Sequence, residues 1–386
     1  MEDKKLEANI KNSQLKNKLI IATRMRKKPA TWILVILIAL LFAIYYLVAN
    51  DIIIKASKPS PYTSTKKDHT KISFMGDVSA SRYLKEQGDK LGKDVFYKDV
   101  KDIWGDSDLA IANLEASVVE DPKKYDDLVV RMDRKKIYLD VNKSDIVAMK
   151  DSGIDLIGYA NNHAIDYGAQ GMRESLKIFE EVGIDYVGAG YTLDDARVPY
   201  TFKANGKKVS ITAITDRIPK RYTSGVNLPR VYTTAYFYKD YEMKKTFSKN
   251  DINIVFVHWG TENGLVPEKE IREMGRKWID LGADLIIGSH THVLMPVEKY
   301  KDGLIAYSLG NLVFDQMYGR TTDSTVANFY QNDKERYMEF VPIRINKGVP
   351  FITDNQDDAR RIFNSLTKEL PKEGYKIENG KLRIDF

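Results

Sequence analysis

The stretch Ala283-Asp-Leu-Ile-Ile-Gly-Ser-His-Thr-His292 combines an apolar run, a glycine and two histidines two residues apart. The apolar run is typical of a buried strand. In an extended segment, residues i and i+2 project to the same side. We therefore expect His290 and His292 to point the same way at the end of this strand, where imidazoles are well placed to bind a metal ion. Because the chain has only five histidines, we favour a metal site over two histidines in a surface loop.

The composition of the 386-residue chain is that of a globular protein, with 43% hydrophobic and 30% charged residues. Cysteine is absent, which excludes disulfide bonds, thiolate metal ligands and a thiol nucleophile. Residues 1–28 contain nine Lys/Arg and three acidic residues, which accounts for the whole formal net charge of +6. The remainder is neutral, so we expect no nucleic-acid partner.

An uncharged apolar segment follows the basic N-terminus. Trp32 to Ala49 is 18 residues without a charge, which is long enough to cross a bilayer as a helix. The basic flank predicts a cytoplasmic N-terminus and an extracellular body. The long basic region and the long apolar run favour an uncleaved anchor over a cleaved signal peptide. We therefore expect a single-pass protein of the cell membrane.

Beyond the anchor, short apolar runs alternate with helical patterns, which predicts an α/β fold. The predicted strands are Lys71–Met75, Leu109–Leu114, Asp155–Tyr159, Asp185–Gly188, Val209–Thr215, Ile252–Val257, Asp284–Ile287 and Leu304–Ser308, with further strands near Tyr337–Ile345. Helices are expected around Met172–Phe179, ending at Gly183, and around Ile271–Leu281, ending at Gly282. The predicted organisation is a basic cytoplasmic segment (1–30), a transmembrane anchor (31–54), a linker with an exposed His69 (55–70), the main domain (71–345) and a C-terminal extension with a peripheral helix and a short strand (346–386).

Potential metal ligands lie at the carboxyl ends of the predicted strands, where ligands gather in open α/β folds. They are Asp77, Asn113, Glu115, Asn161, Asn162, His163, His258, His290 and His292. Each has a structural alternative, such as a turn residue or a packed histidine, but together they favour one pocket. Imidazole and carboxylate ligands without thiolate suit one or two ions of Mn, Fe or Zn. Glu115 is the natural carboxylate to bridge two ions, which lie roughly 3.5–4 Å apart in such sites.

The sequences of several short motifs resemble those of a known protein family. The motifs are Gly76-Asp77, Asn113-Leu-Glu115, Ala160-Asn-Asn-His-Ala-Ile-Asp-Tyr-Gly168, His258-Trp-Gly260, Ser289-His-Thr-His292 and Tyr307-Ser-Leu-Gly-Asn-Leu-Val-Phe-Asp-Gln316. They resemble the calcineurin-like metallophosphoesterases and, within them, the CapA/PgsA family of poly-γ-glutamate capsule synthesis proteins. The resemblance covers roughly residues 71–320. It implies a four-layer αββα metallophosphatase-like sandwich, an N-terminal membrane anchor, and as partners the other subunits of a polymer synthesis or export complex and the anionic polymer.

The resemblance also assigns roles by position. Asp77 and His292 would hold one metal, and Glu115 would bridge it to a second metal held by Asn162, His258 and His290. His163 would face the substrate as a general acid or charge stabiliser. The wider phosphoesterase pattern begins Asp-x-His, whereas this chain has Asp77-Val-Ser79, and its bridging residue is usually Asp. The first metal is therefore one ligand short: Ser79 or water substitutes, or only one metal binds.

Other residues are candidates for supporting roles. Asp166 could orient His163 or cap the following helix, and Glu262 could support His258 or be a surface acid. Asn311 could line the pocket or form a turn. The basic loop that contains Arg217 and Arg221 could contact an anionic polymer or be solvated. Asn113 and Asn161 are further candidates for contacting the substrate or for supporting the metal ligands.

Three functions therefore compete. The chain could be an anchored extracellular component of poly-γ-glutamate synthesis or export, as the resemblance implies. It could be a metal-dependent hydrolase of a phosphoester or of the polymer, as the ligands indicate. It could also be a non-catalytic scaffold that binds polymer or partners, which the missing first-motif histidine favours. The first function names a pathway, so it is compatible with either of the other two.

Overall fold

A computed structural model describes residues 68–125, 137–218, 229–237 and 240–386, together with Lys16 and Ile38. Residues 57–386 form a compact unit that is distinct from residues 1–56. The predicted anchor at 31–54 lies outside the described residues, apart from Ile38. Among the described residues, no helix is both long enough and apolar enough to span a bilayer.

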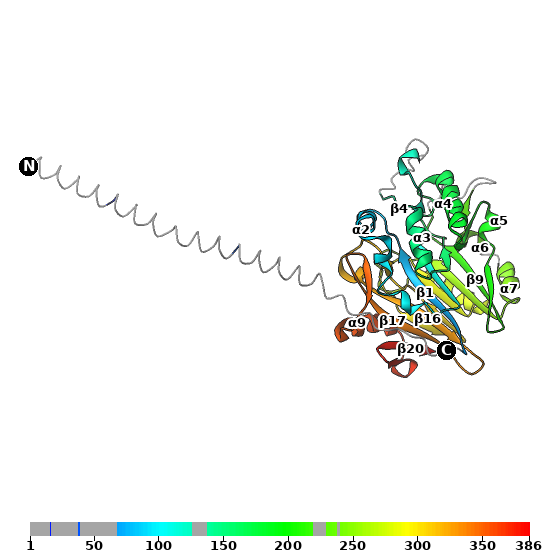
Figure 1. The fold of residues 1–386 in the computed structure, drawn as a ribbon. Helices are drawn as coiled ribbons and strands as arrows, with labels where there is room; N and C mark the ends of the chain where they lie inside the picture. The colour runs from blue at the N-terminus through cyan, green and yellow to red at the C-terminus, as the bar shows by residue number, and fades with distance from the viewer. Residues whose placement is uncertain (1–15, 17–37, 39–67, 126–136, 219–228, 238–239) are drawn as a thin grey trace, which may run out of the picture. The chain divides into compact units, whose positions relative to one another are not determined.

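The compact unit contains two large sheets (Figure 1). The larger is ten-stranded, with the order β19-β20-β17-β16-β1-β2-β5-β6, while β15 pairs with β1 and β18 pairs with β17. Its strands are β1 (Thr70–Val78), β2 (Leu109–Leu114), β5 (Leu156–Gly158), β6 (Asp185–Val187), β15 (Asn311–Val313), β16 (Asp323–Gln331), β17 (Arg336–Asn346), β18 (Val349–Ile352), β19 (Lys376–Glu378) and β20 (Lys381–Asp385). The strands β1, β2, β5 and β6 run parallel.

The smaller sheet is six-stranded, with the order β13-β14-β12-β11-β9-β8. Its strands are β8 (Tyr200–Ala204), β9 (Lys207–Thr215), β11 (Ile252–His258), β12 (Leu285–Ser289), β13 (Val297–Tyr300) and β14 (Gly303–Ala306). The strands β9, β11, β12 and β14 are parallel to one another. The α/β class and the first eight predicted strands are therefore confirmed, with ends that differ by a few residues. The parallel strands bury both faces, which explains their continuous apolar runs.

The two sheets pack face to face around a shared core. Phe74 of β1 and Phe256 of β11 contribute to this core, and their rings stack with centroids 6.4 Å apart. Gly158 of β5 leaves room for Phe256, because a Cβ there would lie 2.5 Å from the ring. Side chains alternate along a strand, so Val255 and Val257 of β11 point to a second core on the outer face of the smaller sheet.

Helices cover the outer face of each sheet. The larger sheet packs against α3 (Lys143–Asp151) and α4 (Gly168–Val182), which lie side by side in Figure 1. The smaller sheet packs against α7 (Asp240–Phe247) and α8 (Lys269–Asp280). Both predicted helices are confirmed as α4, which ends at a left-handed Gly183, and α8. The order of layers is helix, sheet, sheet, helix.

The remaining elements of the unit are short, except for α2 (Tyr83–Leu91) and α9 (Gln356–Thr367). They include β3 (Ser117–Val118), β4 (Asp140–Val141), β7 (Ala189–Gly190), α5 (Leu193–Ala196), β10 (Arg230–Val231) and α6 (Thr234–Phe237), and the 3-10 turns Lys93–Phe96, Lys101–Ile103, Pro122–Tyr125, Gly319–Thr322 and Lys372–Gly374. β7 pairs with β10, and β3 pairs with β4.

Three regions differ from expectation. His69 was expected to be exposed but is 6% exposed, because it directly precedes β1 and its ring contacts Glu335 at 2.9 Å. Strand β16 was not predicted, because its buried Ser, Thr and Asn residues hide the apolar pattern of a strand. In the segment 346–386, β20 joins the larger sheet through β17, and α9 buries Ile362 in the core between the sheets.

Candidate metal centre

The carboxyl ends of β1, β2, β11 and β12 bring the candidate ligands together. In β1 the backbone is irregular between Met75 and Asp77, and the Asp77 amide donates to the Gly310 carbonyl at 3.0 Å. A Cβ at position 76 would lie 1.9 Å from that carbonyl oxygen, so only glycine permits the approach. This contact sets Asp77 beside Asn311, its partner in the strand register.

The two histidines of the Ser-His-Thr-His segment do not lie in an extended strand. Strand β12 ends at Ser289, and the φ angles of His290 and His292 are 91° and 59°. This left-handed region costs a non-glycine residue of order 1–3 kcal/mol. The expectation of an extended backbone is therefore wrong, although both rings still lie at the centre, with centroids 6.2 Å apart. The His290 ring lies beside His258, with centroids 4.5 Å apart, whereas the His292 ring lies beside Phe314.

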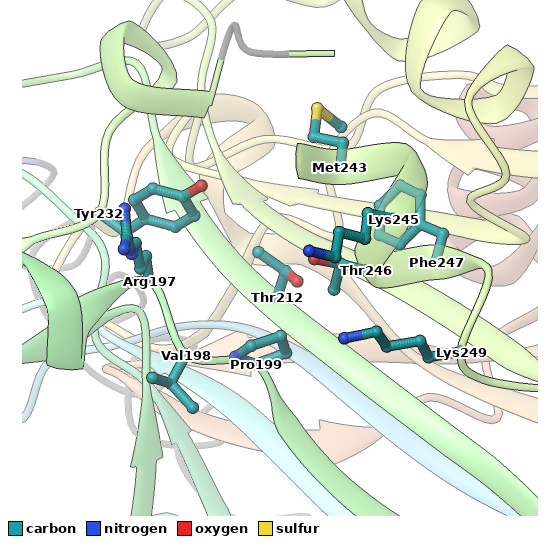
Figure 2. A pocket seen from close by; sticks show the side chains of 10 residues that line it. All are labelled: Arg197, Val198, Pro199, Thr212, Tyr232, Met243, Lys245, Thr246, Phe247 and Lys249. Atoms are coloured by element: carbon teal, nitrogen blue, oxygen red, sulfur yellow. The ribbon is translucent and has the colours of Figure 1, made fainter. Parts of the chain in front are cut away.

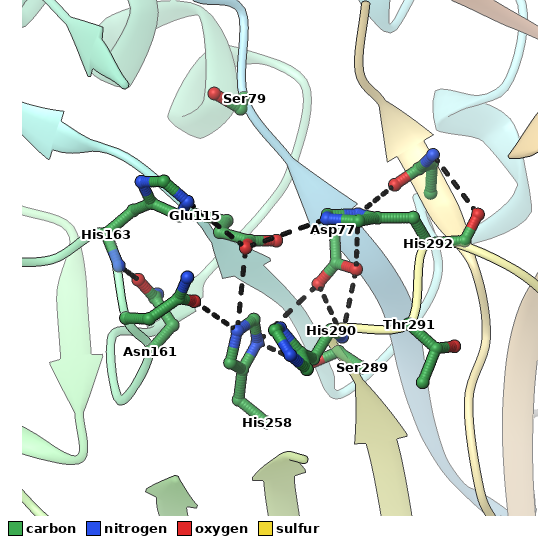
Figure 3. Close-up of polar contacts among 12 residues, drawn as sticks. Asp77, Ser79, Glu115, Asn161, His163, His258, Ser289, His290, Thr291 and His292 are labelled. Atoms are coloured by element: carbon green, nitrogen blue, oxygen red, sulfur yellow. Dashed lines mark hydrogen bonds and ion pairs between the residues drawn. The ribbon is translucent and has the colours of Figure 1, made fainter. Parts of the chain in front are cut away.

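The ionisable ligands form two groups that share one carboxylate. Glu115, His258 and His290 make one group, and Asp77, Glu115 and His292 make the other; within each group the ligand atoms lie within 4.8 Å of one another. All five side chains are buried. Figure 3 shows the Glu115 carboxylate facing the rings of His163, His258 and His292. Glu115 Oε1 lies 3.5 Å from His258 Nε2 and 3.9 Å from His292 Nε2, so one oxygen faces both groups.

Hydrogen bonds from neighbouring residues orient the ligands. Asp77 Oδ1 accepts from Asn113 Nδ2 at 2.7 Å, and Asp77 Oδ2 accepts from the His290 amide at 3.0 Å. Asn311 Oδ1 lies 2.9 Å from His292 Nδ1, and Asn162 Oδ1 lies 2.7 Å from His258 Nε2. The centre therefore brings Asn162 beside the group that contains His258, as the sequence suggested.

The electrostatics of the three histidines differ. Burial and the charges of the neighbouring histidines hold the pKa of His258 well below its usual value, and burial with the His292 charge lowers the pKa of His290 to about 3. Burial also opposes charge on His292, but the carboxylates of Glu115 and Asp77 outweigh it and raise its pKa to about 9. At neutral pH, His258 and His290 are therefore neutral imidazoles, the form that binds metal.

His163 lies at the edge of the centre and is held by Asp166. The His163 Nδ1 atom lies 2.7 Å from Asp166 Oδ2, and this leaves His163 Nε2 facing Glu115 Oε1 at 3.9 Å. Asp166 also accepts from the Leu139 amide. The side chain of Asp166 therefore contacts His163, and α4 begins two residues later without a side-chain cap.

The remaining candidate residues differ in their burial. Asn161 is buried and accepts from the His163 and Ala164 amides. Arg217 is half-buried, and its charge contributes to the lowered pKa of His258. Glu262 is exposed, which agrees with the second of its two predicted alternatives, a surface acid. Arg221 lies outside the described residues.

Two further findings concern residues around the ligands. Ser79, which could have replaced the missing histidine, hydrogen-bonds to Ser81 at 2.9 Å and stands apart from the ligands in Figure 3. Ser289 contacts His258 Nδ1 at 3.1 Å, and Phe314 packs on His292. Neither Ser289 nor Phe314 was singled out from the sequence, although both lie within the quoted motifs.

Comparison with known proteins shows similarity to capsule synthesis proteins. The profile of the family described as "Bacterial capsule synthesis protein PGA_cap" matches residues 71–316. The "PGA biosynthesis protein CapA" of Bacillus subtilis (strain 168) is 34% identical over 376 residues, covering 96% of this chain and 95% of the relative. The "Capsule biosynthesis protein CapA" of Bacillus anthracis is 30% identical over 363 residues, covering 92% of this chain and 86% of the relative.

Solved structures of similar fold include two 5'-nucleotidases. The enzyme precursor from Thermus thermophilus has a TM-score of 0.40 and 12% identity, over 78% of this chain and 58% of that chain. The enzyme from Candida albicans SC5314 has a TM-score of 0.42 and 14% identity, over 82% of this chain and 61% of that chain.

Proposed function

The chain belongs to the bacterial capsule synthesis protein family PGA_cap, and from this premise we propose that it is an accessory component of poly-γ-glutamate capsule synthesis with a divalent-metal hydrolytic centre. The names of the two Bacillus relatives support the pathway. The apolar segment at 31–54 would anchor the chain in the cell membrane with the compact unit outside the cell. The partners would be the other subunits of the synthesis or export complex and the anionic polymer.

The sharing of Glu115 between the two buried ligand groups is the observation that carries the hydrolytic centre. A second observation tests the fit of a cation. His290 Nδ1 is buried and has no hydrogen-bond partner among the described residues, and its low pKa keeps a lone pair available. Nitrogen and oxygen ligands without thiolate suit Mn, Fe or Zn. A metallophosphatase-like sandwich of four layers is the architecture that we propose for this centre.

The proposed chemistry is hydrolysis of an anionic ester or of the polymer amide. Divalent ions, when bound, would polarise the phosphoryl or carbonyl oxygen of the substrate and activate the water that attacks the bond being cleaved. Asp77, Glu115 and His292 would hold one ion, whose binding would displace the proton that the raised pKa keeps on His292. Glu115, Asn162, His258 and His290 would hold the other. His163, with its Nδ1 atom held by Asp166, would present Nε2 to the substrate and donate a proton to the leaving group.

A non-catalytic scaffold is the second candidate, and the position of Ser79 favours it. The ligand that the first motif lacks is not supplied by Ser79, whose hydroxyl bonds to Ser81. In that case the unit would bind polymer or partner subunits, and substitutions of the ligands would leave capsule output intact.

Metal content separates the two candidates. The full-length chain, purified in detergent and supplied with Mn, Fe or Zn, is examined by elemental analysis beside His258→Ala and His290→Ala variants. Glu262→Ala is the matched control, because it removes an exposed acid from the loop after β11. We expect one or two bound ions in the wild type and control and a loss of at least one in each histidine variant. An ion-free wild type would refute the metal centre and leave the scaffold.

A further inference from the structure

A second concave site lies on the outer face of the smaller sheet, away from the core between the sheets. Its volume is about 330 Å³. Thr212 of β9 forms its base, while Ile211 and Ala213 on either side point into the core between the sheets. The walls come from the turn between α5 and β8, which includes Arg197 and Val198, from Tyr232, and from the region of α7, which includes Lys245 and Lys249 (Figure 2).

The charge of this site is of one sign. Its lining contains three cations and no acidic residue. Lys245 and Lys249 are exposed, and within the described part of the chain neither has a carboxylate within 4.0 Å, whereas Arg197 pairs with the exposed Asp194 at 3.1 Å. Figure 2 shows the ammonium groups of both lysines on the same side of the site as Thr212. A concave surface with cations alone concentrates anions.

The site also offers hydroxyl and apolar groups. Thr212, Thr246 and Tyr232 carry hydroxyls, and Val198 is 61% exposed at the rim. A ligand that suits this surface carries carboxylates for the cations, amides for the hydroxyls and methylene groups for the apolar wall. A γ-linked glutamate chain has one carboxylate, one amide and two side-chain methylene groups in every repeat, so it presents all three kinds of group.

The site is joined to the candidate metal centre through strand β9. Thr212 lines the site, and Thr215, three residues further along, donates from Oγ1 to the His258 carbonyl at 3.0 Å. The Thr215 amide donates to the carbonyl of Tyr232, which lines the site. Three residues of a strand span roughly 10 Å. The site therefore lies near the carboxyl edge of the sheet that also carries His258, although its lining faces the outer side of the sheet.

We propose that this cationic site binds a carboxylate-bearing polymer segment of the γ-linked glutamate type near the carboxyl edge of the smaller sheet. The inference rests on the proposed function, because that function supplies the polymer. It adds a second contact region, separate from the ligands, that distinguishes long polymer from short substrates. Loss of this site would weaken the binding of long chains while the centre itself is retained.

The test measures binding without hydrolysis. A fluorescent γ-linked glutamate decamer is titrated, by anisotropy, with the full-length chain in detergent carrying His290→Ala, so that turnover cannot consume the ligand. In this background the Lys245→Gln/Lys249→Gln double variant is compared with a Lys244→Gln/Lys269→Gln control, which removes the same charge from exposed positions outside the site. We expect about tenfold weaker binding for the double variant only, as for two exposed ion pairs, and a smaller difference in high salt.

Two outcomes would overturn the proposal. Equal affinities of the double variant and the control would show that the site does not bind the polymer. Displacement of the decamer by inorganic phosphate at equal concentration, with the same dependence on the two lysines, would show a phosphate site instead. Because the assay needs neither metal nor turnover, its result is independent of whether the hydrolytic centre exists.

Discussion

Gly76→Ala is the substitution that tests most directly how the fold assembles the proposed metal centre. The new Cβ would lie 1.9 Å from the Gly310 carbonyl oxygen, whereas real Cβ atoms essentially never approach within 3.0 Å. The two backbones must therefore separate by at least about 1.1 Å, the difference between these two distances, and neither can rotate away as a flexible side chain would. Asp77 follows Gly76 directly, and Asn311, which contacts His292, follows Gly310, so the displacement reaches the ligand group of Asp77, Glu115 and His292.

The magnitude follows from this displacement. Inserting a methyl group into a packed interior costs about 1–3 kcal/mol, and we expect a value near the upper end of this range because backbone atoms must move. For a unit of this size that corresponds to a fall in Tm of about 5 °C. A ligand displaced by about 1 Å also lowers turnover by about a hundredfold. We therefore expect reduced metal content as well as reduced stability.

Thermal unfolding by circular dichroism and elemental analysis measure the two effects. Gly105→Ala is the matched control, because its Cβ would meet nothing closer than 3.6 Å; we expect its Tm to change by no more than about 2 °C. A Gly76→Ala protein with wild-type Tm and wild-type metal content would refute the reasoning, since it would show that the contact between β1 and Gly310 does not position Asp77.

Three further predictions concern other residues. Asp166→Asn should lower turnover by about a hundredfold with unchanged metal content, because His163 loses its orienting carboxylate; equal loss of metal would contradict this role. Phe256→Ala should lower the free energy of unfolding by about 3–5 kcal/mol in urea titrations, while exposed Leu91→Ala stays within about 1 kcal/mol. Burial raises the pKa of the Asp145 carboxyl from its ordinary 3.8. Between the two pKa values the native state therefore binds more protons than the unfolded state, and stability falls as pH rises through the raised pKa. Asp145→Asn should lack this fall, and equal pH slopes of stability in the wild type and the variant would contradict the prediction.

Local patterns were sufficient for most elements that position the centre. The apolar runs that end at Leu114 and His258 are buried on both faces, so their sequence reports their strand state directly. The spacing of apolar residues in α4 and α8 does the same for helices. Strand β16 was not predicted because it buries polar side chains that form hydrogen bonds, such as the one between Ser73 and Asn328 at 2.6 Å. No local pattern reveals a hydrogen-bond partner 255 residues away.

The ligand set was accessible from the sequence, but its arrangement was not. Parallel strands bring their carboxyl ends together, which is why Asp77, Glu115 and His258 could be grouped in advance. The left-handed backbone at His290 and His292 could not be predicted, because the φ angle depends on the packing of the whole loop. The sequence left two alternatives open for Glu262 for a related reason, since nearness in sequence to His258 does not determine whether a side chain is buried.

The pairing of β17 with β20 has a consequence for folding. The register joins Tyr337 to Asp385 and Phe340 to Leu382, so this part of the larger sheet forms only when two segments far apart in the sequence meet. Until β20 pairs, β17 presents unpaired backbone groups on that side, and Phe340 is not covered by Leu382. A substitution that detaches β20 would therefore expose a strand that can pair with a neighbouring molecule.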